Sequence, residues 1–202
     1  MSVKFEASDY ILTILYREKL REYREKFEEM KNPKIVFVTD LTSCSHKRML
    51  RFKFPELTLR FEPQMILGEL LHVGLESILE KEGFEKEVPI ETKYTISGQE
   101  FIVKGRVDAL SKELIVEIKT GRKGQSLPHP HHIMQLQIYM NILNVDRGVL
   151  VYVTPDKIVE YAVTKEPISI EQLLEETVKN LTHPRWKWEC RYCIYNKMCP
   201  YR

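Results

Sequence analysis

The chain has 202 residues, of which 43% are hydrophobic and 30% are charged, which is enough to build one core with at most a small appendage. Its 31 basic and 29 acidic residues nearly cancel, so the net charge points to no class of partner. No apolar run approaches the roughly 20 residues that span a bilayer, and the first ten residues lack the apolar segment of a secretory signal. We therefore expect a cytoplasmic protein with no membrane partner.

The first sixty residues predict a mainly helical part of the chain. A long helix is expected over 8–31, with an apolar stripe near its start, and an Asn-Pro pair at 32–33 ends it. Residues 34–38 are expected to be extended, and a second helix is predicted over 40–52. Cys44 falls in the first turns of that helix, where a lone cysteine is usually a small buried hydrophobe.

A third helix is predicted over 61–82 from a broad arc of apolar residues. Gly68, His72 and Glu76 share one stripe of this helix, and Gly68 would let a neighbouring backbone come close. A histidine on a mostly apolar helix is more often a hydrogen-bonded core residue than a ligand, so both interpretations of His72 stay open. The apolar arc contains Ile66, Leu67, Leu70, Leu71, Leu75, Ile78 and Leu79.

Strands follow this helix. One is predicted over 88–96, and Gly98 fits the turn after it. The stretch from 100 to 119 predicts two further strands joined by a tight turn near Ser111 and Lys112, because apolar residues recur there at period two. These period-two residues are Val103, Val107, Ala109, Leu114, Val116 and Ile118.

The two strands of this hairpin carry a pair of carboxylates. With a two-residue turn, Asp108 pairs with Ile115, which makes Asp108 and Glu117 diagonal neighbours with Cβ atoms roughly 7–8 Å apart. Two carboxylates at that separation can bind one cation, and Lys119 shares a face with Glu117. The simpler alternative is a charged, solvated face on two edge strands.

A basic, glycine-containing loop at 120–124 follows the hairpin and is either a phosphate-binding loop or an ordinary charged turn. A helix is predicted over 128–144, on which Gln135 and Tyr139 share one face. Three histidines stand at its start, and with prolines between them a polar entry loop is favoured over a metal site. These histidines are His129, His131 and His132.

The rest of the chain completes the predicted fold. Strands are expected over 148–154 and 157–163, followed by an amphipathic helix over 168–181 that Ser169 can cap. The tail, 183–202, is basic and aromatic. Strands interspersed with helices at mixed connection lengths predict an α/β (α+β) fold with one central mixed β-sheet flanked by helices.

The four cysteines are unevenly distributed. Cys190, Cys193 and Cys199 have the spacing C-x2-C-x5-C, whereas Cys44 lies 146 positions before Cys190. In a reducing compartment such a set favours a metal over disulfides, and one distant ligand favours an iron–sulfur cluster over zinc. A zinc site in which His46 replaces one thiolate is the alternative. Either site would join the N-terminal helices to the C-terminal tail.

Five motifs occur in the order that is typical of one nuclease family. They are V-T-D-L-x-x-C at 38–44, G-E-L-L-H at 68–72, G-R-V-D at 105–108, E-I-K at 117–119 and Q-L-Q-I-Y at 135–139. From about residue 36 to residue 202 the chain resembles RecB-like nucleases of the PD-(D/E)xK superfamily. The four cysteines are similar to the iron–sulfur staple of a subset of them. The short length, without a helicase motor, resembles the fourth family of CRISPR-associated (Cas) proteins, the adaptation exonuclease.

The resemblance implies a single nuclease domain over 1–202. Its restriction-endonuclease-like core would occupy 61–165, between an N-terminal helical part over 1–60 and a C-terminal helix and cysteine segment over 166–202. It also implies a [4Fe-4S] cluster on Cys44, Cys190, Cys193 and Cys199.

The resemblance further implies roles for the motif residues. The ligands of Mg²⁺ or Mn²⁺ would be His72, Asp108, Glu117 and the carbonyl of Ile118. Lys119 would orient the attacking nucleophile or neutralise charge on the phosphate. Gln135 and Tyr139 would position the strand, with Tyr139 free to stack on a base or to bond a phosphate. The implied catalytic set is therefore Asp108, Glu117, Lys119, Gln135 and Tyr139.

The expected function is that of a metal-dependent DNA exonuclease that acts on single strands or overhangs and trims DNA for CRISPR spacer acquisition. Its expected partners are DNA, mainly single-stranded, and CRISPR adaptation proteins such as the integrase, while homo-oligomerisation stays open. Two alternatives are a non-catalytic nucleic-acid-binding module with a structural metal, and a repair or viral nuclease of the same superfamily.

Overall fold

The computed structural model describes residues 6–201. Residues 1–5, which belong to the segment expected to lack a secretory signal, and Arg202 of the basic tail lie outside the described residues. No helix within the described range is long and apolar enough to cross a lipid bilayer. The elements in chain order are α1 (Tyr10–Lys31), β1 (Ile35–Phe37), α2 (Val38–Leu41), α3 (Ser45–Lys53), η1 (Pro55–Thr58), α4 (Pro63–Lys81), β2 (Glu85–Ile96), β3 (Gln99–Leu110), β4 (Ile115–Thr120), α5 (Pro130–Leu143), β5 (Arg147–Val153), β6 (Ile158–Thr164), α6 (Ile170–Val178), α7 (Glu189–Tyr192) and η2 (Asn196–Met198).

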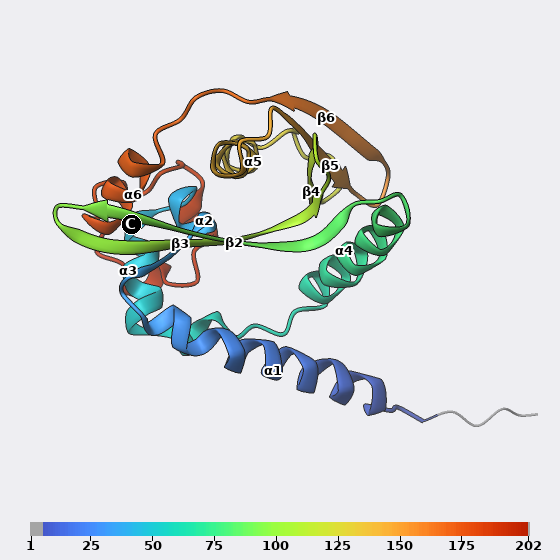
Figure 1. Ribbon diagram of the computed structural model, residues 1–202. Helices are drawn as coiled ribbons and strands as arrows, with labels where there is room; N and C mark the ends of the chain where they lie inside the picture. The colour runs from blue at the N-terminus through green and yellow to red at the C-terminus, as the bar shows by residue number, and fades with distance from the viewer. Residues whose placement is uncertain (1–5, 202) are drawn as a thin grey trace, which may run out of the picture.

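One mixed sheet organises the molecule. Its order is β1-β3-β4-β5-β6, with β2 paired to β3 as well. The β1–β3 and β4–β5 pairs are parallel, whereas β2–β3, β3–β4 and β5–β6 are antiparallel. Helices α5 and α6 lie on one side of the long β2–β3 ribbon and α4 lies on the other (Figure 1). The predicted mixed sheet flanked by helices is therefore confirmed.

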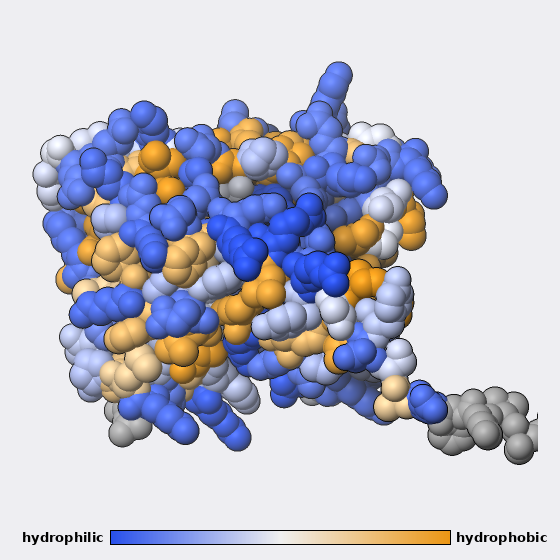
Figure 2. All heavy atoms as spheres, turned by 90° about the horizontal axis from the view of Figure 1, so that it is seen from below, coloured by the Kyte–Doolittle hydropathy of each residue, from blue (hydrophilic) through white to orange (hydrophobic). Residues whose placement is uncertain are grey.

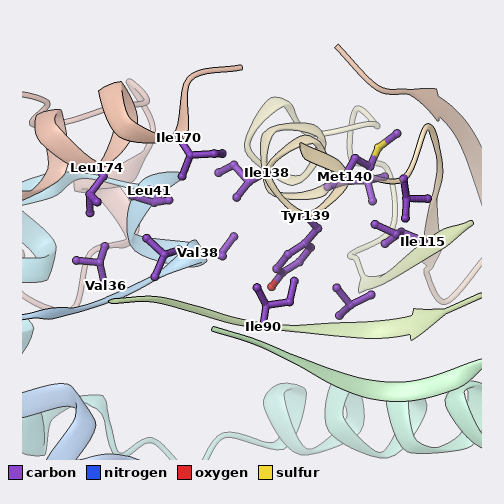
Figure 3. Packing of buried hydrophobic residues seen from close by; sticks show 14 of the residues in the cluster. Val36, Val38, Leu41, Ile90, Ile115, Ile138, Tyr139, Met140, Ile170 and Leu174 are labelled. Carbon is purple, nitrogen blue, oxygen red and sulfur yellow. The ribbon is translucent and has the colours of Figure 1, made fainter. Parts of the chain in front are cut away.

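The larger core lies between the sheet and α5, and one tyrosine of α5 reaches deep into it. The ring of Tyr139 points from α5 towards the strands near Ile90 (Figure 3). It lies against Gly105 of β3, where a Cβ atom would be 2.7 Å from the Tyr139 Cε1 atom and 2.9 Å from the Val38 Cγ2 atom. Only glycine fits this contact without a displacement of the tyrosine ring.

Helix α4 covers the other face through a smaller core that contains Ala109, Val116 and Ile118. Gly68 permits close packing, but against a side chain and not the backbone that was predicted, because a Cβ atom there would lie 3.1 Å from the Thr120 Oγ1 atom at the end of β4. The apolar arc of this helix is only partly buried. Leu67, for example, is 67% exposed, because the sheet covers only one side of α4.

The predicted helix over 8–31 is confirmed as α1, but its apolar stripe does not enter the core. None of the described residues of α1 is buried, and Ile11 is 63% exposed. Contacts with the body include the ion pair between Lys19 and Glu69 of α4. Viewed from the side of α1, the surface shows apolar side chains scattered among charged ones (Figure 2).

The predicted second helix over 40–52 is wrong as a continuous element. It is divided into α2 and α3, and Cys44 stands at the N-terminus of α3. The Asp40 carboxylate accepts a hydrogen bond from the Phe37 backbone N at 2.9 Å, which caps the start of α2, and it pairs with Arg51 of α3 at 2.6 and 2.7 Å, which holds the two helices together across the break. The chain turns at 42–44, which presents Cys44 to the C-terminal tail.

Candidate active site and cysteine cavity

The hairpin that carries the candidate carboxylates has a longer turn than predicted. Residues 111–114 form the connection, closed by a hydrogen bond from the Ser111 N to the Leu114 O at 2.9 Å. Leu110 pairs with Ile115, so the predicted pairing of Asp108 with Ile115 is wrong by two residues. A shift of two residues keeps each side chain on its face of the sheet, whereas a shift of one would invert it.

Asp108 and Glu117 do converge, as predicted. The regular pairing of β3 with β4 stops at Ala109, next to Asp108. The Asp108 Oδ2 atom instead accepts a hydrogen bond from the Ile118 backbone N at 2.6 Å. The Nδ1 atom of His72 lies 3.5 Å from the Asp108 Oδ1 atom, so the imidazole points towards this carboxylate rather than into the core. Strands β3 and β4 and helix α4 therefore each contribute one member of the group.

The Glu117 side chain is 1% exposed, and its Oε2 atom is buried without a hydrogen-bond partner in the described part of the chain. Burial raises the pKa of Glu117 above that of an ordinary carboxyl, and the nearby Asp108 carboxylate adds to the rise, although Lys119 opposes it. Burial also disfavours the imidazolium of His72, but Asp108 outweighs this and raises the pKa of His72. A cation placed between these groups would stabilise both carboxylates.

Lys119 joins β4 to α5 through a chain of polar contacts. Its Nζ atom donates to Glu117 and, at 3.1 Å, to the Gln135 Oε1 atom, while the Gln135 Nε2 atom donates to the Tyr139 hydroxyl at 3.3 Å. The structure thus brings together all the predicted catalytic residues. The predicted freedom of Tyr139 to stack on a base is wrong, because its ring is 2% exposed and only its hydroxyl is directed at the polar groups.

Sequence reasoning assigned no role to Glu76, which is 4% exposed on α4. Its Oε1 atom lies 3.8 Å from the Nδ1 atom of His72. One ligand atom from each of His72, Glu76 and Asp108 lies within 4.8 Å of the others. The four-residue spacing from His72 was the signal for this contact, since residues at i and i+4 of a helix are neighbours.

Two cavities adjoin each other at the candidate active site. The first, of about 570 Å³, lies over Asp108 and Glu117 and is called the carboxylate cavity. The second, of about 410 Å³, is lined by all four cysteines and is called the cysteine cavity. Both cavities are lined by Thr39, Arg51, Lys119 and Gln135.

The four cysteines reach this cavity from the start of α3 and from the tail, and each is a half-buried free thiol. The alternative ligand His46 lies outside this cavity, with its Nδ1 atom 3.3 Å from the Asn180 Nδ2 atom and its ring 4.8 Å from that of Tyr201. Among residues 6–201, no three cysteine sulfurs lie within 4.8 Å of one another.

Hydrogen bonds also hold the tail against α3. The carboxylate of Glu189 accepts from the Cys44 backbone N at 2.8 Å and from the backbone N atoms of Arg185 and Trp186. The Trp186 indole N donates to the Thr42 O at 2.7 Å, and the Ser45 N donates to the Thr182 O at 2.8 Å. The cysteines are therefore brought together by the fold itself.

Comparisons with known proteins agree with this arrangement. The family model of the PD-(D/E)XK nuclease superfamily matches residues 60–200. The CRISPR-associated exonuclease Cas4 of Saccharolobus solfataricus is 38% identical over 202 aligned residues, which cover 94% of this chain and 98% of that relative. The crystal structure of SSO0001 aligns with a TM-score of 0.87 at 36% identity and covers 98% of both chains. These similarities extend over both the sheet and the cysteine-bearing tail.

Proposed function

Because the chain belongs to the PD-(D/E)XK nuclease superfamily and, within it, to the family of the CRISPR-associated exonuclease Cas4, we propose that it is a metal-dependent DNA exonuclease that trims single strands or overhangs during CRISPR spacer acquisition. The observation that carries this proposal is the buried, unpartnered Glu117 Oε2 atom beside Asp108, His72 and Lys119. A non-catalytic DNA-binding module would gain nothing from convergent buried carboxylates, which repel phosphate.

The donor set fits Mg²⁺ or Mn²⁺. Carboxylate oxygens suit both ions, and an imidazole nitrogen is compatible with Mn²⁺. We infer that Asp108, Glu117 and His72 hold the ion and that the Ile118 carbonyl completes the set of protein ligands. When bound there, a divalent cation polarises the scissile phosphate and lowers the pKa of water.

The remaining residues position the reacting groups. Lys119 brings a positive charge next to Glu117, where it would neutralise charge that develops on the phosphate. Gln135 holds the Lys119 ammonium from the other side, and Tyr139 fixes Gln135 in turn. Because Tyr139 is locked against Gly105, this chain of contacts is preorganised before substrate arrives.

The size of the carboxylate cavity supports a single strand as substrate. At about 570 Å³ it has the volume of a small-ligand pocket, which is enough for an unpaired nucleotide. Its lining includes Lys26, Lys104 and Arg106, which can contact backbone phosphates. We propose that the CRISPR integrase delivers the DNA ends that enter this cavity.

The cysteine cavity fits an iron–sulfur cluster better than one zinc ion. Four thiolates around one zinc at a Zn–S distance of about 2.3 Å would lie roughly 3.8 Å from one another. Among the described residues no three cysteine sulfurs lie within 4.8 Å of one another, and four thiol ligands suit a [4Fe-4S] cluster. We propose that the cluster is structural and stabilises the contact between α3 and the tail.

An assay on end-labelled DNA tests the function. Single-stranded and overhang substrates are expected to be shortened stepwise in Mn²⁺ or Mg²⁺, and blunt duplex DNA to be shortened much more slowly. No substrate should be cleaved in EDTA. Gel resolution of the products at single-nucleotide steps provides the measurement. Metal-independent cutting, or binding of DNA without cutting in either ion, would contradict the proposal.

Glu76 provides a test of the metal site that does not depend on cleavage. We expect Glu76→Gln to weaken Mn²⁺ binding by about tenfold, because a Glu76 carboxylate oxygen lies within 4.8 Å of the ligand atoms of His72 and Asp108 and adds negative charge beside the cation. Binding is measured by calorimetry or by the electron paramagnetic resonance signal of free Mn²⁺. Glu80→Gln, one turn later on the exposed surface of α4, is the matched control and should bind normally. Equal affinity of Glu76→Gln and wild type would exclude this role.

A further inference from the structure

Helix α4 is apolar on two faces, and the fold covers only one of them. Its inner face packs on the β2–β3 ribbon and β4 (Figure 1) and directs His72 and Glu76 to the candidate metal site. The opposite face, called the outer face of α4, carries four large apolar side chains that are each more than half exposed. They are Leu67, Leu70, Val73 and Ile78. An uncovered apolar helix face of this kind is typical of a surface that packs against another protein surface.

Gly74 lies in the middle of this face and is not explained by the folded chain. Of the eight glycines of the protein, three have a positive φ, and four others have atoms within 4 Å of the place where a Cβ would stand. Gly74 has neither property. A glycine inside a helix destabilises it relative to alanine, but it lets a second backbone come close. No segment within residues 6–201 makes that approach at Gly74.

The outer face of α4 is also free of charge from Leu67 to Ile78. The two acidic residues in this part of the helix are turned elsewhere, since Glu69 pairs with Lys19 of α1 and Glu76 is buried beside His72. The Ser77 hydroxyl donates to the backbone O of Val73 at 2.7 Å. DNA and anionic membranes bind to basic surfaces, so a neutral apolar face favours a protein partner.

The exposed area suits a partner of substantial size. Together with Met65, the apolar side chains of the outer face leave roughly 500 Å² uncovered, and those at the start of α1 leave a similar area among charged neighbours. Each partner of a stable dimer buries about 800 Å², with an apolar core and a more polar rim. The outer face of α4 can supply that core, and the start of α1 can supply the rim.

The pattern along α4 is complementary to itself. Leu70 lies four residues before Gly74, and Ile78 lies four residues after it. If a second copy packs antiparallel about a two-fold axis at Gly74, each Leu70 meets the partner's Ile78. Lys81 then lies over the partner's Leu67, which its methylene groups can cover while its ammonium stays in water.

We propose that the outer face of α4 is the interface of a homodimer, in which the α4 helices of two copies cross antiparallel at Gly74. None of the residues of this face lines the carboxylate cavity, so the cavity of each copy remains open to substrate. The inference concerns assembly and does not depend on the proposed nuclease function.

Sedimentation velocity of the whole protein, purified without oxygen and without DNA, tests the interface from about 0.1 to 100 µM. We expect a dimer of the 24.0 kDa chain at micromolar concentration. Leu70→Glu should raise the dissociation constant at least about a hundredfold, because it buries an unpaired charge against a copy of itself. The control is Ile158→Glu on β6, which alters a side chain that is 67% exposed and should leave the dimer unchanged.

A double variant tests the antiparallel register. Leu70→Glu combined with Ile78→Lys should bind at least about tenfold more tightly than Leu70→Glu alone, because opposite charges then meet across the axis. Within one helix the two positions are about 12 Å apart, so an ion pair inside one chain cannot cause this rescue.

Gly74→Gln separates association from folding. Glutamine is a better helix former than glycine and meets no neighbour in the single chain, so the melting temperature of dilute, dissociated protein should rise. The same substitution should weaken the dimer about tenfold, because it holds the two helices apart. If Leu70→Glu proves unfolded by circular dichroism, the opposite effects of Gly74→Gln on melting and on association still decide the matter.

Three results would overturn the interface. They are a wild-type protein that is monomeric at the highest concentration, an assembly that neither Leu70→Glu nor Gly74→Gln weakens, and a double variant that is no tighter than Leu70→Glu. A monomer that binds a different protein through Leu70 would assign this face to that partner and refute the homodimer.

Discussion

Replacement of Asp108 by asparagine or of Glu117 by glutamine is expected to abolish DNA cleavage and leave the fold intact. Each carboxylate would contribute several kcal/mol through the bound cation, so cleavage rates should fall by about a thousandfold or more. The Glu117 carboxylate is buried with one oxygen unpartnered, and without metal it costs stability. Single-turnover cleavage and thermal melting in EDTA measure the two effects.

Glu113→Gln is the matched control for these substitutions. Glu113 is exposed in the turn between the same two strands, and its loss should change neither cleavage nor melting. The melting temperature of Glu117→Gln in EDTA should equal or exceed that of wild type. Wild-type cleavage by both Asp108→Asn and Glu117→Gln would show that chemistry takes place elsewhere, and a large loss of stability would show that the pair is structural.

Loss of the proposed cluster is expected to have the largest effect on stability. Cys44→Ala leaves three ligands and an open, labile site, so the protein should lose iron and acid-labile sulfide together. Cross-linking Cys44 to a residue 146 positions away stabilises the fold by about 4–5 kcal/mol on the loop-closure model. The expected fall in melting temperature is then about 10–20 °C.

Below this lowered melting temperature the hydrogen bonds of Glu189 still link the tail to Cys44 without any metal. The sheet of Cys44→Ala should therefore stay folded at room temperature while protease sensitivity rises in the tail. Ser43→Ala is the control, because the Ser43 hydroxyl donates only to the nearby Thr39 O and its loss should not release iron. Wild-type protein that contains zinc and no sulfide, purified without oxygen, would contradict the cluster.

Much of the candidate site could be predicted because its geometry tolerates the errors of sequence reasoning. The turn at 111–114 was predicted two residues too short, yet Asp108 and Glu117 stay together, since a slip of two residues preserves the face of a strand. The place of Lys119 beside Glu117 follows from strand alternation within β4 alone. Such local patterns do not depend on the rest of the fold.

Features that depend on distant contacts could not be predicted. Apolar periodicity located α4 but gave no information on what covers each side of it, and Leu67 is exposed. The Asp40 pair with Arg51 holds α2 and α3 together across the break before Cys44, and the Cys44 backbone is bonded by Glu189, which is 145 residues away. The burial of Tyr139 depends likewise on a glycine of another strand.

The contact between Gly105 and Tyr139 has a consequence for the variation of this family over evolution. The glycine that opens the G-R-V-D motif touches no reacting group; it leaves room for a ring on α5. Alanine at 105 would displace the tyrosine and, through Gln135, the ammonium of Lys119. Positions 105 and 139 should therefore covary, so that homologues with a larger residue at 105 carry a smaller one at 139.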